Sequence, residues 1–155
     1  MNAIDLLTED HRRVKRLLSE LEDTTTRGVK TRTELFERLE RDLVAHEAIE
    51  EEIFYPALRD HPKARELVLE SYVEHEVVDR LLGELKSTPV DDEVWGPKAR
   101  VMIENLRHHV EEEETELFKK ARAAFDREEL DELGQRMARR KEELAASASA
   151  RSSAP

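Results

Sequence analysis

Histidine and glutamate stand four residues apart at two places in the 155-residue chain. His46 is followed by Glu50, and His109 is followed by Glu113. Residues four apart lie on one face of an α-helix with Cβ atoms about 6 Å apart, so each pair can hold one metal ion or let its carboxylate bridge two. Imidazole and carboxylate donors together suit iron, manganese or zinc. The two pairs therefore indicate a metal centre.

The two pairs belong to a longer internal repeat. The segment HEAIEEEIFY (residues 46–55) aligns without a gap with HVEEEETELF (residues 109–118). His, Glu and Glu coincide at the first, fifth and sixth positions, and both segments end in an apolar–aromatic pair. Two similar half-sites on antiparallel helices suit a dinuclear centre with a pseudo-twofold arrangement.

Helices must position these side chains. Apolar residues repeat at three- and four-residue steps, which predicts four amphipathic helices at about residues 2–23, 31–58, 62–86 and 92–125. Thr31 with Glu34, and Asp126 with Glu129, have the spacing of capping boxes, and the second box predicts a polar fifth helix to about Ala145. We expect an all-α fold, an up-down-up-down four-helix bundle with an additional C-terminal helix outside it.

A single domain is expected over residues 1–145. From residue 146 to residue 155 the chain is almost entirely Ala and Ser, with nothing to bury, which predicts a disordered tail.

Each of the four expected bundle helices carries one histidine on its apolar stripe: His11, His46, His75 and His109. Glu50 and Glu113 lie on the same stripes, one turn after His46 and His109. Burying a bare carboxylate costs several kcal/mol unless a positive charge compensates. No lysine or arginine occupies these stripe positions, so a metal cation is the expected compensator.

Other polar residues near the stripes receive different predictions. Glu47, beside His46, fits either a ligand or a solvated charge, and Asp79, one turn after His75, fits a hydrogen-bonding residue better than a ligand. His108 points about 100° away from its neighbour on a helix and is expected to be exposed. Tyr55 and Tyr72 could donate hydrogen bonds to the site, although packing in the core with a satisfied hydroxyl is the favoured interpretation. The remaining acids of 50–52 and 111–116 are expected on a solvated face.

Composition excludes several classes of protein. Acids outnumber bases 37 to 26, which argues against a nucleic-acid partner. No apolar run approaches the roughly 18–20 residues that span a bilayer, so no membrane partner is expected. The absence of cysteine excludes disulfides, Zn–Cys sites and iron–sulfur clusters. The first residues lack a basic segment followed by an apolar stretch, so we expect no secretory signal and a cytoplasmic location.

These motifs resemble the hemerythrin-like, HHE cation-binding family. The matching stretches are DHR (10–12), HEAIEEEIFYPAL (46–58), YVEHE (72–76) and HHVEEEETELF (108–118). The resemblance implies a non-haem diiron centre inside the bundle, with two irons bridged by carboxylates and an oxygen species. It implies the ligands His11, His46, Glu50, His75, His109 and Glu113, with Glu50 and Glu113 as the bridging carboxylates.

The chain departs from the oxygen-carrying hemerythrins at one position. Those proteins have a second histidine one turn after the first on the third helix, where this chain has Asp79. Glu47 could fill the gap, because a glutamate at that position is a ligand in the iron-sensing F-box branch of the family. A carboxylate in place of an imidazole should favour ferric iron. The resemblance therefore favours sensing, peroxide or nitric oxide chemistry, or iron handling, over simple O2 carriage.

The favoured hypothesis is a diiron protein that binds or reacts with a small diatomic ligand or peroxide. The alternative is an iron-responsive regulatory or iron-handling module without turnover. A ferritin-like centre is disfavoured because no histidine has a glutamate three residues before it. A zinc hydrolase is disfavoured because position 50 after His46-Glu47 is not histidine. A metal-free helical interaction protein would leave the His/Glu set unexplained.

Overall fold

The computed structural model describes residues 1–152, and the described chain is helical apart from short turns and its first residues. Two of the segments, labelled η, are π-helical turns. In chain order the elements are α1 (Ala3–Glu22), α2 (Val29–Ile49), η1 (Glu50–Phe54), α3 (Tyr55–Arg59), α4 (Arg65–Lys86), α5 (Trp95–Glu112), η2 (Glu113–Leu117), α6 (Phe118–Ala124) and α7 (Arg127–Ser152). No helix in this described part is long and apolar enough to cross a membrane.

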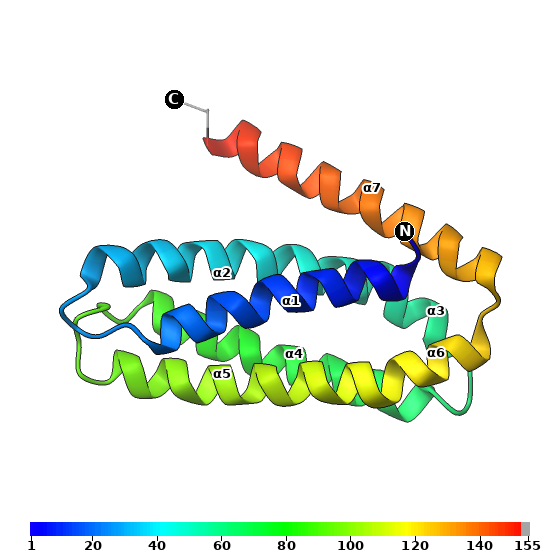
Figure 1. Ribbon diagram of the computed structural model, residues 1–155, viewed down its shortest axis with the longest axis horizontal. Coiled ribbons are helices and arrows are strands. Elements are labelled where there is room, and N and C mark those ends of the chain that lie inside the picture. The colour runs from blue at the N-terminus through cyan, green and yellow to red at the C-terminus, as the bar shows by residue number, and fades with distance from the viewer. Residues whose placement is uncertain (153–155) are drawn as a thin grey trace.

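Four rods form the body of the molecule and alternate in direction (Figure 1). The rods are α1, the continuous α2–η1–α3, α4, and the continuous α5–η2–α6. Helix α1 packs against α2 and α5, and α4 packs against α5. Helix α7 lies outside the four rods and diverges from them toward its C-terminal end (Figure 1). The predicted up-down-up-down bundle with an additional C-terminal helix is confirmed.

A polar side chain caps the first turn of α1 and of α7, but not that of α2. Asn2 accepts the Asp5 N–H at 2.9 Å and begins α1. Before α7, Asp126 and Glu129 each accept the other's backbone N–H at 2.8 Å, so the predicted capping box is present. The box predicted at Thr31 is wrong, because α2 begins earlier, at Val29, and Gly28 caps it without a side-chain bond. Helices α4 and α5 begin at Arg65 and Trp95, slightly later than expected.

Both repeat segments contain a π-helical turn where continuous α-helix was expected. Glu50 is the first residue of η1, and its carbonyl accepts the Tyr55 N–H. Glu113 is the first residue of η2, and its carbonyl accepts the Phe118 N–H. A π turn adds one residue to a helical turn, so it rotates everything that follows it relative to the α-helical register. Each inserted residue thereby turns the aromatic residue that ends the repeat, Tyr55 or Phe118, into the core.

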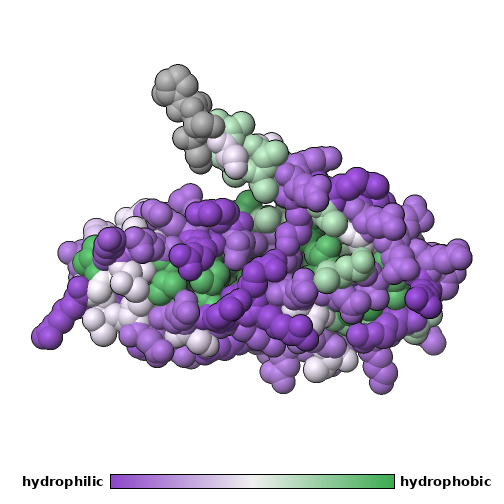
Figure 2. All heavy atoms as spheres, turned by 45° about the horizontal axis from the view of Figure 1, so that its top comes forward, coloured by the Kyte–Doolittle hydropathy of each residue, from purple (hydrophilic) through white to green (hydrophobic). Residues whose placement is uncertain are grey.

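Two apolar clusters divide the interior of the bundle along its length. One lies at the end of the bundle where α7 begins and includes Leu7, Phe54 and Phe118. The other lies toward the opposite end and includes Leu18, Leu39 and Met102. The four histidines and Glu113 come from the chain segments between these clusters, and Glu50 directly follows Ile49 of the first cluster. Most of the face shown in Figure 2 is hydrophilic, in keeping with the high charged fraction of the chain.

The C-terminal region differs from its prediction. Helix α7 does not end near Ala145 but continues to Ser152. Alanine is the strongest helix former, and the Ala/Ser run follows a helix that is already nucleated, so it can extend the helix without burying anything. The expected disordered tail of residues 146–155 is therefore helical to residue 152, and residues 153–155 lie outside the described part.

Candidate metal centre

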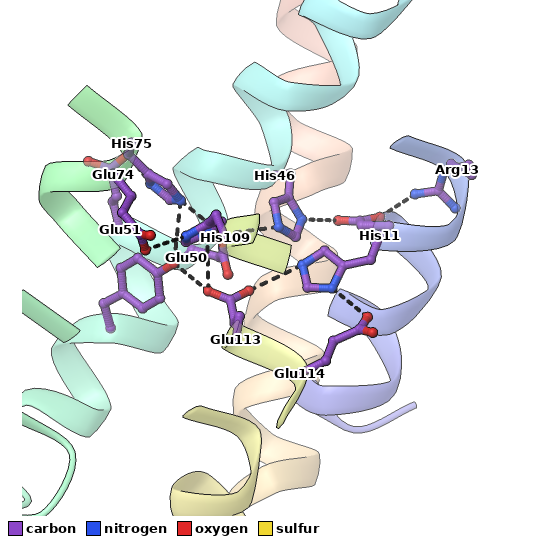
Figure 3. Close-up of polar contacts among 12 residues, drawn as sticks. His11, Arg13, His46, Glu50, Glu51, Glu74, His75, His109, Glu113 and Glu114 are labelled. Atoms are coloured by element: carbon purple, nitrogen blue, oxygen red, sulfur yellow. Dashed lines mark hydrogen bonds and ion pairs between the residues drawn. The ribbon is translucent and has the colours of Figure 1, made fainter. Parts of the chain in front are cut away.

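Four histidines and two glutamates meet inside the bundle, one or two from each rod (Figure 3). None of the six residues is more than 5% exposed. Two groupings bring their ligand atoms within 4.8 Å of one another, and Glu50 belongs to both. The first grouping is His11, His46, Glu50 and Glu113, and the second is Glu50, His75 and His109. The structure thus brings together the six residues that the resemblance implies as ligands, while Glu47, the seventh candidate, belongs to a different grouping.

The two glutamates lie between two pairs of histidines. Glu50 Oε1 is 3.0 Å from His46 Nε2 and 3.3 Å from His75 Nε2. Glu113 Oε1 is 3.2 Å from His11 Nε2, and Glu113 Oε2 is 3.5 Å from His109 Nε2. The ring centroids of His11 and His46 are 4.9 Å apart, as are those of His75 and His109. Each carboxylate therefore faces one histidine of each pair, as a ligand shared between two ions would.

Every histidine of the centre has a carboxylate at its other ring nitrogen. The Nδ1–carboxylate distances are 2.8 Å for His11–Glu114, 2.9 Å for His46–Asp10, 3.1 Å for His75–Glu51 and 2.8 Å for His109–Glu74. A carboxylate at Nδ1 favours the tautomer that carries its proton there and leaves the Nε2 lone pair directed into the centre. Carboxylate–histidine pairs of this kind orient metal-binding imidazoles and raise their basicity.

The pseudo-twofold relation indicated by the repeat extends to these outer carboxylates. Glu51 and Glu114 occupy the sixth position of the two repeats, and each contacts the histidine of a different rod. Asp10 and Glu74 each immediately precede a histidine of the centre in the chain. Each contacts not that neighbour but the histidine that begins a repeat. Each half of the centre therefore consists of two motifs. One rod supplies an acidic residue followed by histidine, and the next rod supplies His-x3-Glu-Glu.

Several buried donor atoms of the centre have no hydrogen-bond partner. They are His11 Nε2, His46 Nε2, His109 Nε2, Glu113 Oε1 and both carboxylate oxygens of Glu50. Leaving a buried polar atom unsatisfied costs about 1–3 kcal/mol, more when the group is charged. These atoms converge on one small region and come from nitrogen and oxygen donors only. The donor set fits a pair of metal ions of intermediate hardness, such as iron, manganese or zinc.

Proton binding by the histidines reflects the same excess of negative charge. Burial alone lowers the pKa of His46, but the charge of Glu50 and the bond to Asp10 outweigh burial and raise this pKa to about 10. Burial alone also lowers the pKa of His75, but the carboxylates of Glu50 and Glu51 beside its ring outweigh burial and raise this pKa to about 11. Without metal, these imidazoles therefore hold protons as the counter-charge to the carboxylates. A metal ion must displace those protons when it binds.

Tyr55 contacts the centre directly, although its favoured interpretation was core packing. Its hydroxyl donates to Glu113 Oε2 at 2.5 Å and lies 3.3 Å from His75 Nε2. Burial, together with the charges of Glu113 and Glu50, raises the pKa of Tyr55 well above its usual value. The hydroxyl therefore stays protonated and donates a hydrogen bond to the glutamate. Tyr72 differs, since its hydroxyl donates at 3.2 Å to the Glu51 carbonyl.

Glu47 lies at the edge of the centre, beside Glu51 and His75. It is 8% exposed, and its Oε1 has no partner. Burial and the neighbouring carboxylate of Asp79 raise its pKa to about 9. The structure separates Glu47 from the position between the histidine pairs, so its role as a ligand stays a prediction. Asp79 itself is exposed and contacts Glu47 rather than an imidazole of the centre.

Sequence reasoning missed the outer carboxylates. The sequence pattern predicts Glu51 and Glu114 on a solvated face and indicates no role for Asp10 or Glu74. One signal was available for the first two, because the repeat matches glutamate at its sixth position as well as its fifth. His108 is exposed, as predicted, with its side chain 72% accessible beside Glu112.

Comparison with known proteins agrees with this geometry. A solved structure of a hemerythrin HHE cation binding domain-containing protein from Mycobacterium kansasii superposes with a TM-score of 0.84 and 30% sequence identity. The alignment covers 96% of this chain and 90% of that one. A Nostoc sp. protein named DNA nickase is 28% identical over 132 residues. That match covers 85% of this chain but 37% of the Nostoc protein, so the chain spans little more than a third of that relative.

The family model for the hemerythrin HHE cation binding domain matches residues 2–121, which include three bundle rods completely and the fourth up to Ala121 in α6. This match and the buried His/Glu cluster together indicate that the chain binds metal cations. The chain belongs to the hemerythrin HHE cation-binding domain family.

Proposed function

We propose that the protein is a non-haem diiron protein that binds or reacts with O2, peroxide or nitric oxide. The observation that carries the proposal is the shared position of the two glutamates. Glu50 faces His46 and His75, and Glu113 faces His11 and His109. A centre for a single ion would not need two histidine pairs that are separated by two carboxylates.

His11 and His46 would hold one iron, His75 and His109 the other, and Glu50 and Glu113 would bridge them. Two bound irons supply one-electron redox steps and an attachment point for a small ligand. The protein supplies geometry and electrostatics. The outer carboxylates orient the imidazoles, and the two apolar clusters limit the access of water to the centre. The Tyr55 hydroxyl holds a proton at Glu113 Oε2.

A second candidate is an iron-responsive module whose occupancy controls a partner. The observation that favours it is the contact of Lys141 in α7 with Asp10, which in turn contacts His46. A change at the centre could therefore reach an outer helix. The nicking activity named for the Nostoc protein has no support of this kind, since the match covers 37% of that protein. The absence of a nucleic-acid partner and the cytoplasmic location stay predictions.

Anaerobic loading with Fe²⁺ followed by exposure to O2, peroxide or nitric oxide tests the proposal. We expect about two irons per chain and new ligand-to-metal absorption bands after exposure. Glu116→Ala is a matched control, because Glu116 is an exposed glutamate of the same π turn as Glu113. A chain that holds no iron after loading would contradict both candidates. Stable iron binding without any spectral response would favour the second candidate.

A further inference from the structure

Helix α7 covers only one half of the candidate metal centre. It packs mainly against α1, α2 and η1, the elements that carry His11, His46 and Glu50. In Figure 1 it crosses this side of the bundle, close to the N-terminus. The half that contains His75 and His109 has no corresponding outer helix among the described residues.

One stripe of α7 explains how the helix is held. Leu130, Leu133 and Met137 on this stripe are buried in the apolar cluster next to the centre. At Gly134 the backbone passes so close to the N-terminal residues that a Cβ would lie 2.4 Å from the Met1 carbonyl oxygen. Only glycine allows that approach. The same stripe continues one turn beyond Met137 to Lys141, a charged residue where the pattern would supply another apolar one.

Lys141 reaches the carboxylate that orients His46. Its Nζ donates to Asp10 Oδ1 at 2.5 Å, while Asp10 Oδ2 accepts from His46 Nδ1 at 2.9 Å. Asp10 is 3% exposed, so its charge needs a compensating partner. The cavity beside this contact, which Lys141 and Asp10 line with Arg13 and Asp42, has a volume of about 30 Å³. The hydrogen bond to Oδ1 holds the Lys141 ammonium close to Asp10.

The other half of the centre lacks this connection. Glu74 contacts His109 as Asp10 contacts His46, but no lysine or arginine of the described chain forms an ion pair with Glu74. Asp10 has a second cation, Arg13, which comes from its own helix and is 43% exposed at the side chain. Arg13 cannot link α1 to another element. Lys141 is therefore the residue through which α7 contacts the polar network of the centre.

We propose that Lys141 is a positioning residue for metal binding and that, through Asp10 and His46, docking of α7 is linked to occupancy of the His11–His46 half of the centre. The inference rests on the proposed dinuclear centre. A metal ion at His46 Nε2 needs the imidazole in one orientation, and Asp10 fixes that orientation only while its own carboxylate is held. Thermodynamic linkage makes the coupling reciprocal. If docking of α7 increases the metal affinity of this half by a given factor, metal binding increases the equilibrium constant for α7 docking by the same factor.

Release of Co²⁺ to a chelator tests the inference, with Lys141→Met compared with wild type. Co²⁺ has an absorption spectrum that reports its ligands and needs no O2 reaction. We expect release from wild type in two phases, and about tenfold faster release in Lys141→Met of the one ion that His46→Ala also loses. Lys141→Arg should restore slow release. Arg140→Met is the matched control, because Arg140 pairs with Glu52 and Glu143 at the surface.

Amide hydrogen exchange provides a second readout that does not depend on release rates. In wild type, Co²⁺ loading should slow exchange along α7, and in Lys141→Met this protection should be lost while the bundle stays protected. Equal release and equal protection in Lys141→Met and wild type would overturn the inference, as would equal acceleration of both ions. A chain that binds two Co²⁺, but whose iron-loaded form gives no response to O2, peroxide or nitric oxide, would contradict the diiron chemistry and leave this inference standing.

Discussion

The two halves of the candidate centre use the same ligand types but differ in what surrounds them. His46 and His109 begin the two repeats, and each is followed four residues later by a buried glutamate. At the tenth position of the repeats, however, one half has Tyr55 and the other Phe118. The Tyr55 hydroxyl lies 3.3 Å from His75 Nε2. Phe118 instead stacks on His11 with ring centroids 5.8 Å apart and planes 4° apart.

This difference shows that symmetry in the ligands does not require symmetry in the chemistry. The His75–His109 half has the Tyr55 hydroxyl and the nearby Glu47. The His11–His46 half has the apolar ring of Phe118 and the two cations, Arg13 and Lys141, that pair with Asp10. The electrostatic environments of two bound ions would therefore differ, and we expect the two ions to differ in affinity and redox potential. Substitutions that remove what the halves share should affect both ions, and substitutions within one half should affect one.

Glu113→Ala removes a group shared by both halves and should have the largest effect. The carboxylate faces His11 with one oxygen and His109 with the other, so its loss takes a donor from both ions. We expect metal content to fall from about two ions per chain to less than one, as measured by elemental analysis after desalting. Retention of two ions would show that Glu113 is not a shared ligand, and Glu116→Ala should behave as wild type.

His46→Ala and His109→Ala test the separation of the halves. Each removes one imidazole from one histidine pair, so each should leave about one ion per chain rather than none. The remaining ion should have a different spectrum in the two variants, because the Tyr55 hydroxyl is near only one of the pairs. Identical spectra with one ion would argue that the halves are equivalent in spite of their different surroundings.

Much of this centre could be predicted from sequence, because its ligands lie on α-helical stripes. His46 and Glu50 stay four apart on continuous helix, since the π turn begins only at Glu50. The same holds for His109 and Glu113. Apolar periodicity placed four histidines on four inward faces, and the bundle brought them together.

The outer carboxylates could not be predicted in the same way. Asp10 and Glu74 reach histidines of other rods, so their partners depend on how the helices are packed and rotated. Tyr55 faces the centre because of the π turn, and an α-helical wheel places it incorrectly. Glutamate is also so common in this chain that a functional glutamate does not stand out from a solvated one. The contact of Lys141 with Asp10 depends on where α7 packs, and the apolar pattern of the bundle helices does not predict that position.

Raising the pH should destabilise the metal-free protein. The pKa values of His46 and His75 are raised to about 10 and about 11, so the stability from their protonation is fully present below about pH 6.5 and is lost as the pH rises through those values. The pKa of Glu47, raised to about 9, adds a loss in the same direction between about pH 4.5 and 9. Thermal unfolding with a chelator should show a melting temperature several degrees lower at pH 9 than at pH 6.5.

Metal-loaded protein should not show this fall, because metal replaces the histidine protons. The difference in melting temperature between loaded and metal-free protein should therefore widen as the pH rises. A metal-free protein that becomes more stable between pH 6.5 and pH 9 would contradict the assigned protonation. His46→Gln should reduce the slope, since it removes one of the two titrating imidazoles.

Tyr55→Phe makes the tenth positions of the two repeats alike. It removes a hydrogen bond to a buried carboxylate, which should cost the metal-free protein about 1.5–3 kcal/mol in the free energy of unfolding. Urea denaturation with a chelator measures this loss. Tyr72→Phe is the control, since the Tyr72 hydroxyl donates to a backbone carbonyl and its loss should cost about 0.5–1.5 kcal/mol. Equal losses would show that the Tyr55 bond to Glu113 has no special weight.

His108→Ala should have the smallest effect, although His108 is adjacent to a proposed ligand. Its side chain is 72% exposed and forms an ion pair with Glu112, one turn further along the same helix. An exposed pair of this kind contributes about 0–1 kcal/mol, so we expect two ions per chain and a nearly unchanged melting temperature. Loss of an ion in His108→Ala, but not in His109→Ala, would mean that α5 is rotated by about 100° from the position that the two halves require. The pair of neighbouring histidines thus tests the helix rotation on which the whole comparison of the halves depends.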